Sequence, residues 1–378
     1  MSNKILILSC NTGEGHNSAA KALKQIAETD GIQCDIYDTL SLAGNWLSKA
    51  VSRIYLKSVQ TSLFSTGYAI GEWYSSLESK PKSPIYRFNK IYAKNLYRLI
   101  CDNGYDSVVC THPFPTEALT YLKGIHGLTV PTFFVSTDYT CYPFLDETDM
   151  DGYMIAHPDL TEEFISKGVS KDRIHVTGIP CSAHGIKTPE FQARKEVNEA
   201  YGLSGSSCSG RWFLLMGGSM GFGDMNELVR CLWRRCRPED RIICVCGNNK
   251  KQKRMLDKQY SESPIVTAIG YSDKIPLLLD ACDVLFTKPG GLTSTEALNR
   301  GIPIIHTTPI KGIEDKNARF FHERGMSFTS LHCGDLAEYA FQLCEDGKCR
   351  NKMLESQKHN RLENAAEDIL TIIKEALK

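Results

Sequence analysis

Short runs of apolar residues alternate with longer segments of helical pattern along the whole chain. In the first half the apolar runs read KILILS, SVVCTH, PTFFVS, GYMIAH and RIHVTG. In the second half they read RWFLLMG, RIICVCG, SPIVTAIG, DVLFTKPGG and IPIIHTT. Because short apolar runs separated by helices are typical of parallel strands covered on both faces, the pattern predicts an α/β fold. Two groups of five strands predict two doubly wound domains.

The domain boundary is expected after the fifth apolar run. We expect a first domain over residues 1–185 and a second over residues 186–354, since the Gly/Ser-rich stretch LSGSSCSG then precedes the next strand. The end of the chain repeats apolar residues at three- and four-residue spacing, which predicts a helix with one apolar stripe. The stripe consists of Leu362, Ala366, Ile369, Ile373 and Leu377. We expect residues 355–378 to return to the first domain.

Composition excludes several classes of protein. Lysine plus arginine equals aspartate plus glutamate, 44 against 44, so the charge gives no indication of nucleic acid as a partner. The 15 cysteines are odd in number and form no C-x-x-C pair, which favours reduced thiols in a cytoplasmic protein over a disulfide framework. The sequence has no apolar stretch long enough to span a membrane. We therefore expect peripheral contact with a membrane at most.

Two glycine-rich turns of the second half have the pattern of a phosphate site. They read MGGSMGFGD, residues 216–224, and TKPGGLTSTEAL, residues 287–298, and each follows a predicted strand. Glycines admit a phosphate close to the backbone, and a helix that starts there offers N–H groups. Glu296 could then accept hydrogen bonds from ribose hydroxyls. The alternative to a phosphate site is a structural role, in which the glycines only allow tight packing and Glu296 only caps the helix. Two converging turns in the same half favour binding of a nucleotide diphosphate.

A third glycine turn, residues 11–16, follows the first strand and ends in a histidine. At that position His16 is suited to act as a general base near neutral pH, or it merely caps the helix and bonds a backbone carbonyl. His112 and Asp138 also follow predicted strands. Asp138 would orient an imidazole or act as the base itself, whereas both residues could equally be turn or helix caps.

Two further patterns concern metals and membranes. Asp149-Met150-Asp151 matches a D-x-D metal motif, but we interpret it as a solvated loop and expect no metal site.

Residues 46–100 hold nine cations against two acids, a net charge of +7, and ten aromatic residues that include Trp46, Trp73, Tyr86 and Tyr92. Such a segment suits an anionic membrane surface, although the residues alone favour a solvated helix pair with aromatic residues in its core.

Several of these stretches together resemble glycosyltransferase family 28. They are NTGEGHNSAAKAL, THPF, STDYTCYPF, TGIP, GGSMGFG, CGNNKK and TKPGGLTSTEALNRGIPII, and they cover nearly the whole chain in order. The nearest branch resembles the monogalactosyldiacylglycerol synthases and processive diacylglycerol glucosyltransferases. The resemblance implies a GT-B fold, with two Rossmann-like domains facing a cleft. It further implies metal-independent, inverting transfer of glucose or galactose from a UDP-sugar to diacylglycerol or a related lipid, giving a β-glycolipid.

The resemblance also implies roles for single residues. His16 would deprotonate or position the acceptor hydroxyl. Asp138 is the second catalytic candidate, from its position after a predicted strand. The acceptor side would further include Gly13, Gly15, Asn17 and His112. The UDP-sugar would contact Gly217, Gly218, Ser219, Gly221, Gly290, Gly291, Thr293, Ser294, Glu296, Glu314 and Asn317. No cofactor is implied, and residues 46–100 would rest on the anionic inner face of the cell membrane.

The sequence departs from the family at three positions. Ile313 stands where the family usually has glutamine, Tyr142 where it has histidine, and Ser182 where it often has a basic residue. These departures leave the donor sugar and the lipid open. Three alternatives stay in view: a murein-type N-acetylglucosamine transferase, a UDP-sugar epimerase, and a non-catalytic UDP-sugar sensor.

Overall fold

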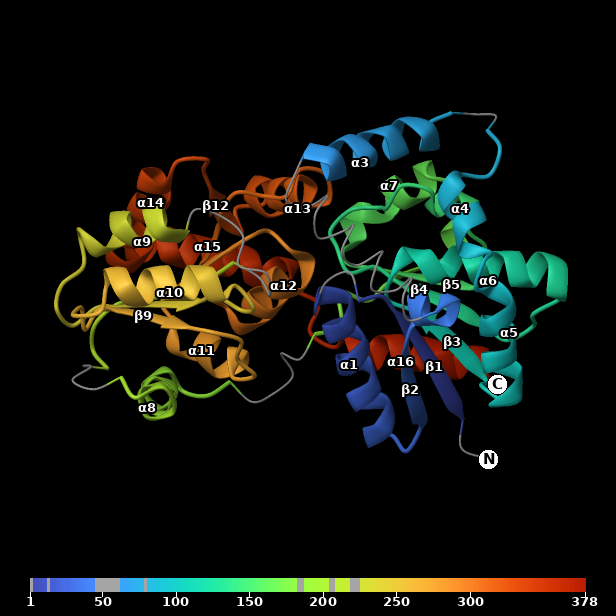
Figure 1. The fold of residues 1–378 in the computed structure, drawn as a ribbon, viewed down its shortest axis with the longest axis horizontal. Helices are drawn as coiled ribbons and strands as arrows, with labels where there is room; N and C mark the ends of the chain where they lie inside the picture. Colours follow the sequence, from blue (N-terminus) through green and yellow to red (C-terminus); the bar gives the residue numbers. More distant parts are fainter. Residues whose placement is uncertain are drawn as a thin grey trace. The chain divides into compact units, whose positions relative to one another are not determined.

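The chain folds into two α/β units (Figure 1). The computed structural model describes residues 3–11, 14–44, 62–77, 80–181, 187–203, 208–217 and 225–378. Unit 1 consists of Met1–Ser182, Lys311–Ile313 and Leu362–Lys378, and unit 2 of Ala183–Ile310 and Glu314–Arg361. The predicted two-domain α/β fold is therefore confirmed.

Unit 1 is built on a parallel sheet with the strand order β2-β1-β3-β4-β5-β6. Its strands are β1 (Lys4–Ser9), β2 (Gln33–Asp38), β3 (Ser107–Cys110), β4 (Thr132–Val135), β5 (Gly152–Ile155) and β6 (Ile174–Val176). In the centre of the sheet Ile5 pairs with Ser107 and Ile7 with Val109. The β1 residues from Ile5 to Ser9 are buried, as expected for a central strand covered on both faces.

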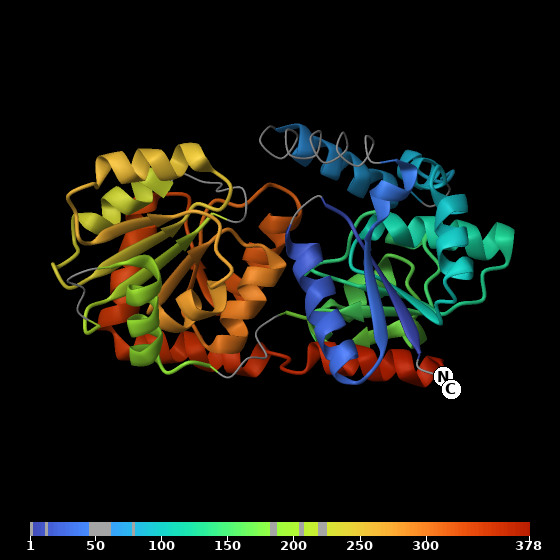
Figure 2. The ribbon, with the colours of Figure 1, turned by 60° about the horizontal axis from the view of Figure 1, so that its bottom comes forward.

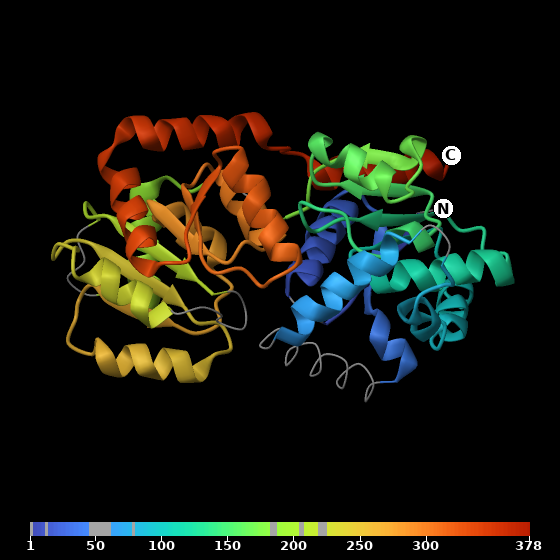
Figure 3. The same ribbon diagram turned by 90° about the horizontal axis from the view of Figure 1, so that it is seen from above.

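Helices cover both faces of this sheet (Figures 2 and 3). The helices of unit 1 are α1 (Glu14–Thr29), α3 (Ser62–Ser75), α4 (Pro84–Asn89), α5 (Ala93–Asp102), α6 (Pro113–His126), α7 (Thr161–Ser166) and α16 (Ala365–Ala376). Short 3-10 turns are η1 (Thr39–Ala43), η2 (Leu145–Glu147), η3 (Pro158–Leu160) and η4 (Lys171–Arg173). Helix α16 packs beside α1 and buries Ile369 and Ile373 against Ile7 and Leu23. The apolar stripe predicted near the C-terminus therefore lies in the core of unit 1.

Unit 2 repeats the plan with the strand order β12-β11-β10-β7-β8-β9. Its strands are β7 (Trp212–Met216), β8 (Arg241–Val245), β9 (Val266–Ile269), β10 (Val284–Thr287), β11 (Ile304–His306) and β12 (Ser327–Thr329). Its helices are α8 (Glu190–Tyr201), α9 (Met225–Trp233), α10 (Lys250–Gln259), α11 (Ile275–Ala281), α12 (Gly291–Arg300), α13 (Ile313–Glu323), α14 (Cys333–Glu345) and α15 (Gly347–Asn360). The rings of Phe213, Phe286 and Phe341 meet edge to face in the core.

The ten strands predicted from apolar runs are all present, and the structure adds β2 and β12. The expected return of residues 355–378 needs a correction, because α15 stays in unit 2 and the chain re-enters unit 1 at Leu362. Arg361 is extended and ends α15, so the predicted continuous helix divides into α15 and α16. Gly178 makes room for the returning chain: its φ is +87°, and a Cβ there would lie 2.9 Å from Leu362 Cβ. The fifteen cysteines all lie among the described residues, and no disulfide joins any of them.

Candidate functional site

His16 lies in the first turn of α1 and is partly buried. Its Nδ1 lies 2.7 Å from the backbone oxygen of Thr111 and 2.9 Å from the hydroxyl oxygen of Thr137. Because a carbonyl oxygen only accepts, Nδ1 donates and carries the proton, and Nε2 keeps its lone pair. Burial lowers the pKa of His16 below 6.5, while the charge of Asp138 and the bond to Thr111 oppose this shift. A neutral imidazole with a basic Nε2 can accept a proton at neutral pH.

His112 lies beside His16, with the two ring centres 4.6 Å apart in an edge-to-face contact. Its Nδ1 accepts a hydrogen bond from the backbone N–H of Phe114 at 3.1 Å, which caps α6. Burial and, second, the neighbouring His16 lower the pKa of His112 well below its usual value. His112 is thus a neutral helix cap that also forms one wall beside the His16 ring.

Asp138 is linked to His16 through two hydroxyl groups. Its Oδ2 accepts a hydrogen bond from the Tyr142 hydroxyl at 2.5 Å, and that hydroxyl lies 3.0 Å from Thr137 Oγ1, which contacts His16. The sequence indicated Asp138 and His16, but it gave no signal for Thr137. Tyr142 stood out only as a departure from the family. The structure brings all four side chains together.

Among the remaining acceptor-side candidates, Asn17 is hydrogen-bonded to β1 and to Asn11, two positions after that strand. Ser9 donates to Asn17 Oδ1 at 2.7 Å, and Asn17 Nδ2 donates to Asn11 Oδ1 at 3.0 Å. Asn11 in turn donates to Asp38 at 3.1 Å. These bonds make Asn17 a support of the turn that presents His16. Gly15 lies in the first turn of α1, and Gly13 lies outside the described residues.

On unit 2, α12 begins at the second predicted phosphate turn, with Gly290 as its N-cap. Thr293 and Glu296 are partly exposed, and their spacing of three residues places them on one face of α12. Ser294 is fully buried, and its hydroxyl lies 3.0 Å from His306 Nε2. This placement is at odds with the expected diphosphate contact of Ser294, because the following position on a helix points about 100° away from Thr293.

Glu314 and Asn317, both on α13, hold the same turn from the side. Glu314 accepts hydrogen bonds from Lys288 Nζ at 2.5 Å and from the Ile310 N–H at 2.8 Å. Asn317 is fully buried and donates to the backbone oxygen of Pro289 at 3.0 Å. In this structure both side chains stabilise the β10–α12 turn, a placement that differs from the direct sugar contact implied by the resemblance. Lys288, which sequence reasoning missed, adds a positive charge next to Gly290 and Gly291.

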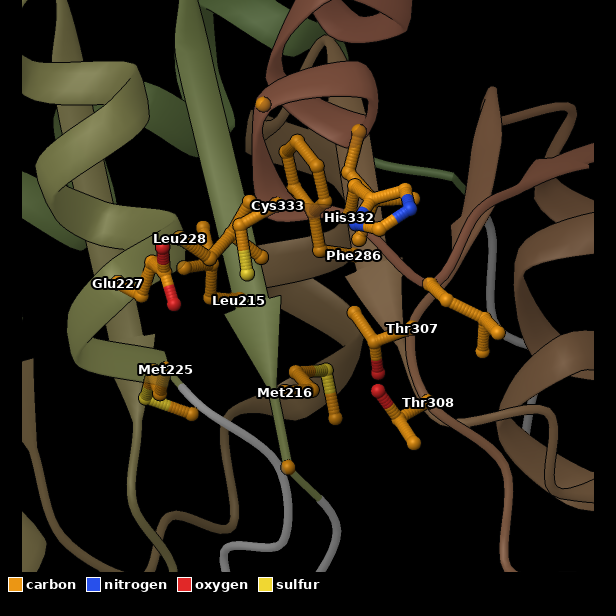
Figure 4. Close-up of a pocket in the computed structure, with 14 residues that line it drawn as sticks. Leu215, Met216, Met225, Glu227, Leu228, Phe286, Thr307, Thr308, His332 and Cys333 are labelled. Atoms are coloured by element: carbon orange, nitrogen blue, oxygen red, sulfur yellow. The ribbon is translucent and has the colours of Figure 1, made fainter.

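The first two residues of the other predicted phosphate turn, Met216 and Gly217, line a cavity of about 310 Å³ (Figure 4). Gly217 lines this cavity directly after β7, and Thr307 and Thr308 line it after β11. Glu227 of α9 and His332 contribute further polar groups to its wall. The carboxyl ends of parallel strands are where open α/β sheets bind ligands. Gly218, Ser219 and Gly221 lie outside the described residues.

The D-x-D stretch has ordinary structural partners. Asp151 accepts hydrogen bonds from Lys123 and from the backbone and side chain of Thr132 at 2.7–3.0 Å, and Asp149 pairs with Arg173. Across the described parts of the chain, no group of three or more His, Cys, Asp or Glu side chains is arranged to hold a metal. In those same parts no helix is long and apolar enough to cross a membrane.

Comparison with known proteins assigns a domain to each unit. Residues 16–181 match the family described as monogalactosyldiacylglycerol (MGDG) synthase, and residues 213–369 match the glycosyltransferase family 28 C-terminal domain. A processive diacylglycerol beta-glucosyltransferase of Bacillus licheniformis is 30% identical over 98% of this chain and 94% of its own length. The protein of that name from Bacillus subtilis is 28% identical over 99% of this chain and 95% of its own length.

Solved structures share the two-domain fold. MurG of Acinetobacter baumannii superposes with a TM-score of 0.64 at 12% identity, covering 99% of both chains. The UDP-GlcNAc 2-epimerase of Neisseria meningitidis, bound to UDP-GlcNAc, superposes with a TM-score of 0.65 at 14% identity, covering 98% of this chain and 100% of the other. At these identities the likeness concerns the fold alone, and it confirms the predicted GT-B architecture. With both domains matched and a relative aligned over nearly the whole length, the chain belongs to glycosyltransferase family 28.

Proposed function

We propose that the chain transfers a hexose from a UDP-sugar to the hydroxyl of diacylglycerol or a related lipid. The relatives that align with nearly the whole chain are named processive diacylglycerol beta-glucosyltransferases. The observation that carries the proposal is the fixed imidazole of His16, whose Nδ1–H is bound by the Thr111 carbonyl so that Nε2 is left basic. A sensor or a sugar-binding module needs no such base.

In the proposed reaction the lipid hydroxyl oxygen attacks the anomeric carbon of the sugar. The bond from that carbon to the UDP oxygen breaks, so the configuration inverts and a β-glycoside forms. His16 Nε2 takes the proton of the attacking hydroxyl, and the electron pair of the broken bond leaves with UDP. The products are a glycolipid and UDP, and the protonated His16 then returns its proton to solvent.

The leaving diphosphate gains negative charge, and the described residues of unit 2 can stabilise it. Gly290 and Gly291 open α12, whose first N–H groups and positive dipole end favour an anion. Lys288 precedes this turn, and the charge of Glu314 keeps it in place. Thr293 and Glu296 share the accessible face of α12 and are proposed to bind the diphosphate and the ribose. We propose that these groups replace a metal ion, in which case a chelator leaves the rate unchanged.

The proposal also includes contact with a membrane, through part of the segment predicted for it. On α3 and just after it, Ile70, Trp73 and Leu77 are 57%, 62% and 38% exposed. The spacing of Ile70 and Trp73 places them on one face of α3, and Leu77 lies two residues after the end of the helix. The opposite side of α3 packs on unit 1, since a Cβ on Gly71 would lie 3.1 Å from the Phe144 ring. An exposed apolar stripe held on a folded body suits insertion at the interface of a bilayer.

The other described residues of the predicted segment lie partly on the surface and partly in the core. Tyr86 and Tyr92 are buried, so these two aromatic residues belong to the core, as the alternative interpretation held. Arg87, Lys94 and Arg98 are exposed and can face anionic headgroups. Trp46 lies outside the described residues. We propose that the Ile70–Trp73–Leu77 stripe and these cations hold the protein on the cytoplasmic face of the cell membrane.

The test is UDP release from UDP-glucose, UDP-galactose and UDP-N-acetylglucosamine, with and without diacylglycerol in anionic micelles. We expect release that depends on lipid and on one hexose donor, with a β-glycolipid as product. Release without lipid, or isomerisation of the sugar, would contradict the proposal and favour an epimerase. For the membrane part, W73S should reduce sedimentation with anionic vesicles, whereas W233S, which changes a 44% exposed tryptophan of unit 2, should not.

A further inference from the structure

A chain of hydrogen bonds leads from the Asp138 carboxylate to the His16 ring. The Tyr142 hydroxyl donates to Asp138 Oδ2 at 2.5 Å, Tyr142 and Thr137 hydroxyls lie 3.0 Å apart, and Thr137 Oγ1 lies 2.9 Å from His16 Nδ1. We call the two side-chain hydroxyls of Thr137 and Tyr142 the hydroxyl bridge. Its members come from the segment that follows β4, whereas His16 comes from α1.

The two ends of this chain fix the direction of every hydrogen bond in it. Asp138 Oδ2 accepts, so the Tyr142 hydroxyl donates its single proton to Asp138 and must accept a hydrogen bond from Thr137. The Thr137 hydroxyl therefore donates its single proton to Tyr142, and toward His16 it can only accept. The Thr111 carbonyl, 2.7 Å from the same Nδ1, likewise only accepts. Both constraints place the imidazole proton on Nδ1 and leave Nε2 as the basic nitrogen.

Burial keeps this arrangement intact. Thr111, Thr137 and Tyr142 are 0%, 2% and 4% exposed, so bulk water does not compete for their hydrogen bonds. Burial and then the charge of Asp138 hold the pKa of the Tyr142 phenol well above its usual value, so the phenol remains a donor. Hydrogen bonds in such surroundings polarise one another, which lets a carboxylate stabilise positive charge two hydroxyls away.

We infer that Thr137 and Tyr142 are positioning residues of the transfer reaction. Together with the Thr111 carbonyl, the hydroxyl bridge holds His16 in the tautomer whose Nε2 is basic. The bridge also conveys the negative charge of Asp138 to the imidazolium that forms when Nε2 takes the acceptor proton. The inference rests on the proposed role of His16 as the base. It gives a function to Tyr142, which stands where the family usually has histidine.

The first test compares kinetics of Y142F, T137V and T137S. Y142F and T137V each break the hydroxyl bridge with little change in shape, so we expect kcat to fall about 10- to 100-fold, with the KM for the UDP-sugar unchanged within about twofold. T137S keeps the hydroxyl and should restore most of the rate. Because either break interrupts the same chain, the double variant should be no slower than the slower single one.

Y153F is the matched control. Tyr153 is also a buried tyrosine, its ring also meets Phe134 edge to face, and its hydroxyl also makes two hydrogen bonds, to Thr148 and Met150. Neither bond leads to His16. If losing a buried phenol hydroxyl only loosened unit 1, then Y153F would slow the reaction as much as Y142F. We expect Y153F to stay within about twofold of the parent kcat.

A second measurement separates the inference from the proposed function. Nitrogen-15 NMR of histidine-labelled protein reports which ring nitrogen of His16 carries the proton, without any substrate. We expect Nδ1–H in the parent chain and also in Y142F, because the Thr111 carbonyl still accepts from Nδ1. The pH at which His16 is half protonated should fall in Y142F, because the charge of Asp138 is no longer conveyed to the imidazolium, and H16A assigns the signal. Nε2–H in the parent, or an unchanged protonation midpoint and kcat in Y142F, would overturn the hydroxyl bridge. Full transfer by H16A would instead overturn the proposed base.

Discussion

The free energy of unfolding should depend strongly on the protonation of one buried carboxyl group, that of Glu117. Glu117 lies on α6, is 4% exposed, and accepts a hydrogen bond from Asn89 Nδ2 at 2.7 Å. Burial raises the pKa of Glu117 from 4.5 to about 8, against the opposing effect of that hydrogen bond. Between these two values the folded chain holds a proton that the unfolded chain has released. The free energy of unfolding therefore falls as the pH rises through this window.

The size of the effect follows from the shift of the pKa. At 1.36 kcal/mol per unit, Glu117 would lower the free energy of unfolding by about 5 kcal/mol at most on going from below pH 4.5 to above pH 8. E117Q keeps the shape of the side chain and an oxygen for Asn89, but it does not titrate. We expect the variant to lose less stability than the parent chain between pH 5 and pH 8.

Urea unfolding at pH 5, 6, 7 and 8 measures this difference in slope. E199Q, which changes an exposed glutamate on α8, is the matched control and should follow the parent chain within about 0.5 kcal/mol at each pH. Comparing how the free energy of unfolding changes with pH cancels the pH-independent effect of the amide at position 117. Parallel profiles for E117Q and the parent chain would refute the argument, since they would mean that Glu117 is ionised in the folded state.

Three further predictions concern the two halves of the site. Burial lowers the pKa of His16, so the acid limb of kcat/KM should have its midpoint below pH 6.5, and activity should be lost only as the pH falls through that point; a midpoint above 6.5 would contradict the assignment. E296Q should raise the KM for the UDP-sugar about tenfold with a smaller effect on kcat, and an unchanged KM would show that Glu296 does not hold the ribose. S294A should lower the thermal midpoint because His306 loses a buried hydrogen bond, with donor KM unchanged; a raised KM would restore Ser294 to the diphosphate site.

Apolar runs predicted ten of the strands that the structure describes but missed two edge strands. β2 and β12 each lie at one edge of their sheet, as do β6 and β9, which were predicted. β2 reads QCDIYD and β12 reads SFT, so neither has the run of apolar residues by which the others were recognised. An edge strand needs less apolar surface because one side has no neighbouring strand. Such an edge strand forms by pairing with the neighbouring strand, and that pairing cannot be recognised from the local sequence.

The sequence predicted those residues of the candidate site whose type is distinctive at their position. It could not predict the residues that contact them, because these are of common types. Glycines before a helix and a histidine after a strand are informative, and the structure places His16 and Gly290 at helix starts. Thr111 and Thr137 are two threonines among many, and they meet His16 only because β3 and β4 end at the same edge of the sheet. Ser294 shows the opposite case, since its motif predicts a ligand contact whereas its hydroxyl lies buried beside His306.

Transfer by H16A, measured together with its affinity for UDP, tests whether His16 is the base. H359A, a change of an exposed histidine on α15, is the control. We expect H16A to bind UDP like the parent chain and to lose lipid-dependent transfer by about 100-fold or more, whereas H359A transfers normally. Transfer at the parent rate by H16A would show that His16 is not the base.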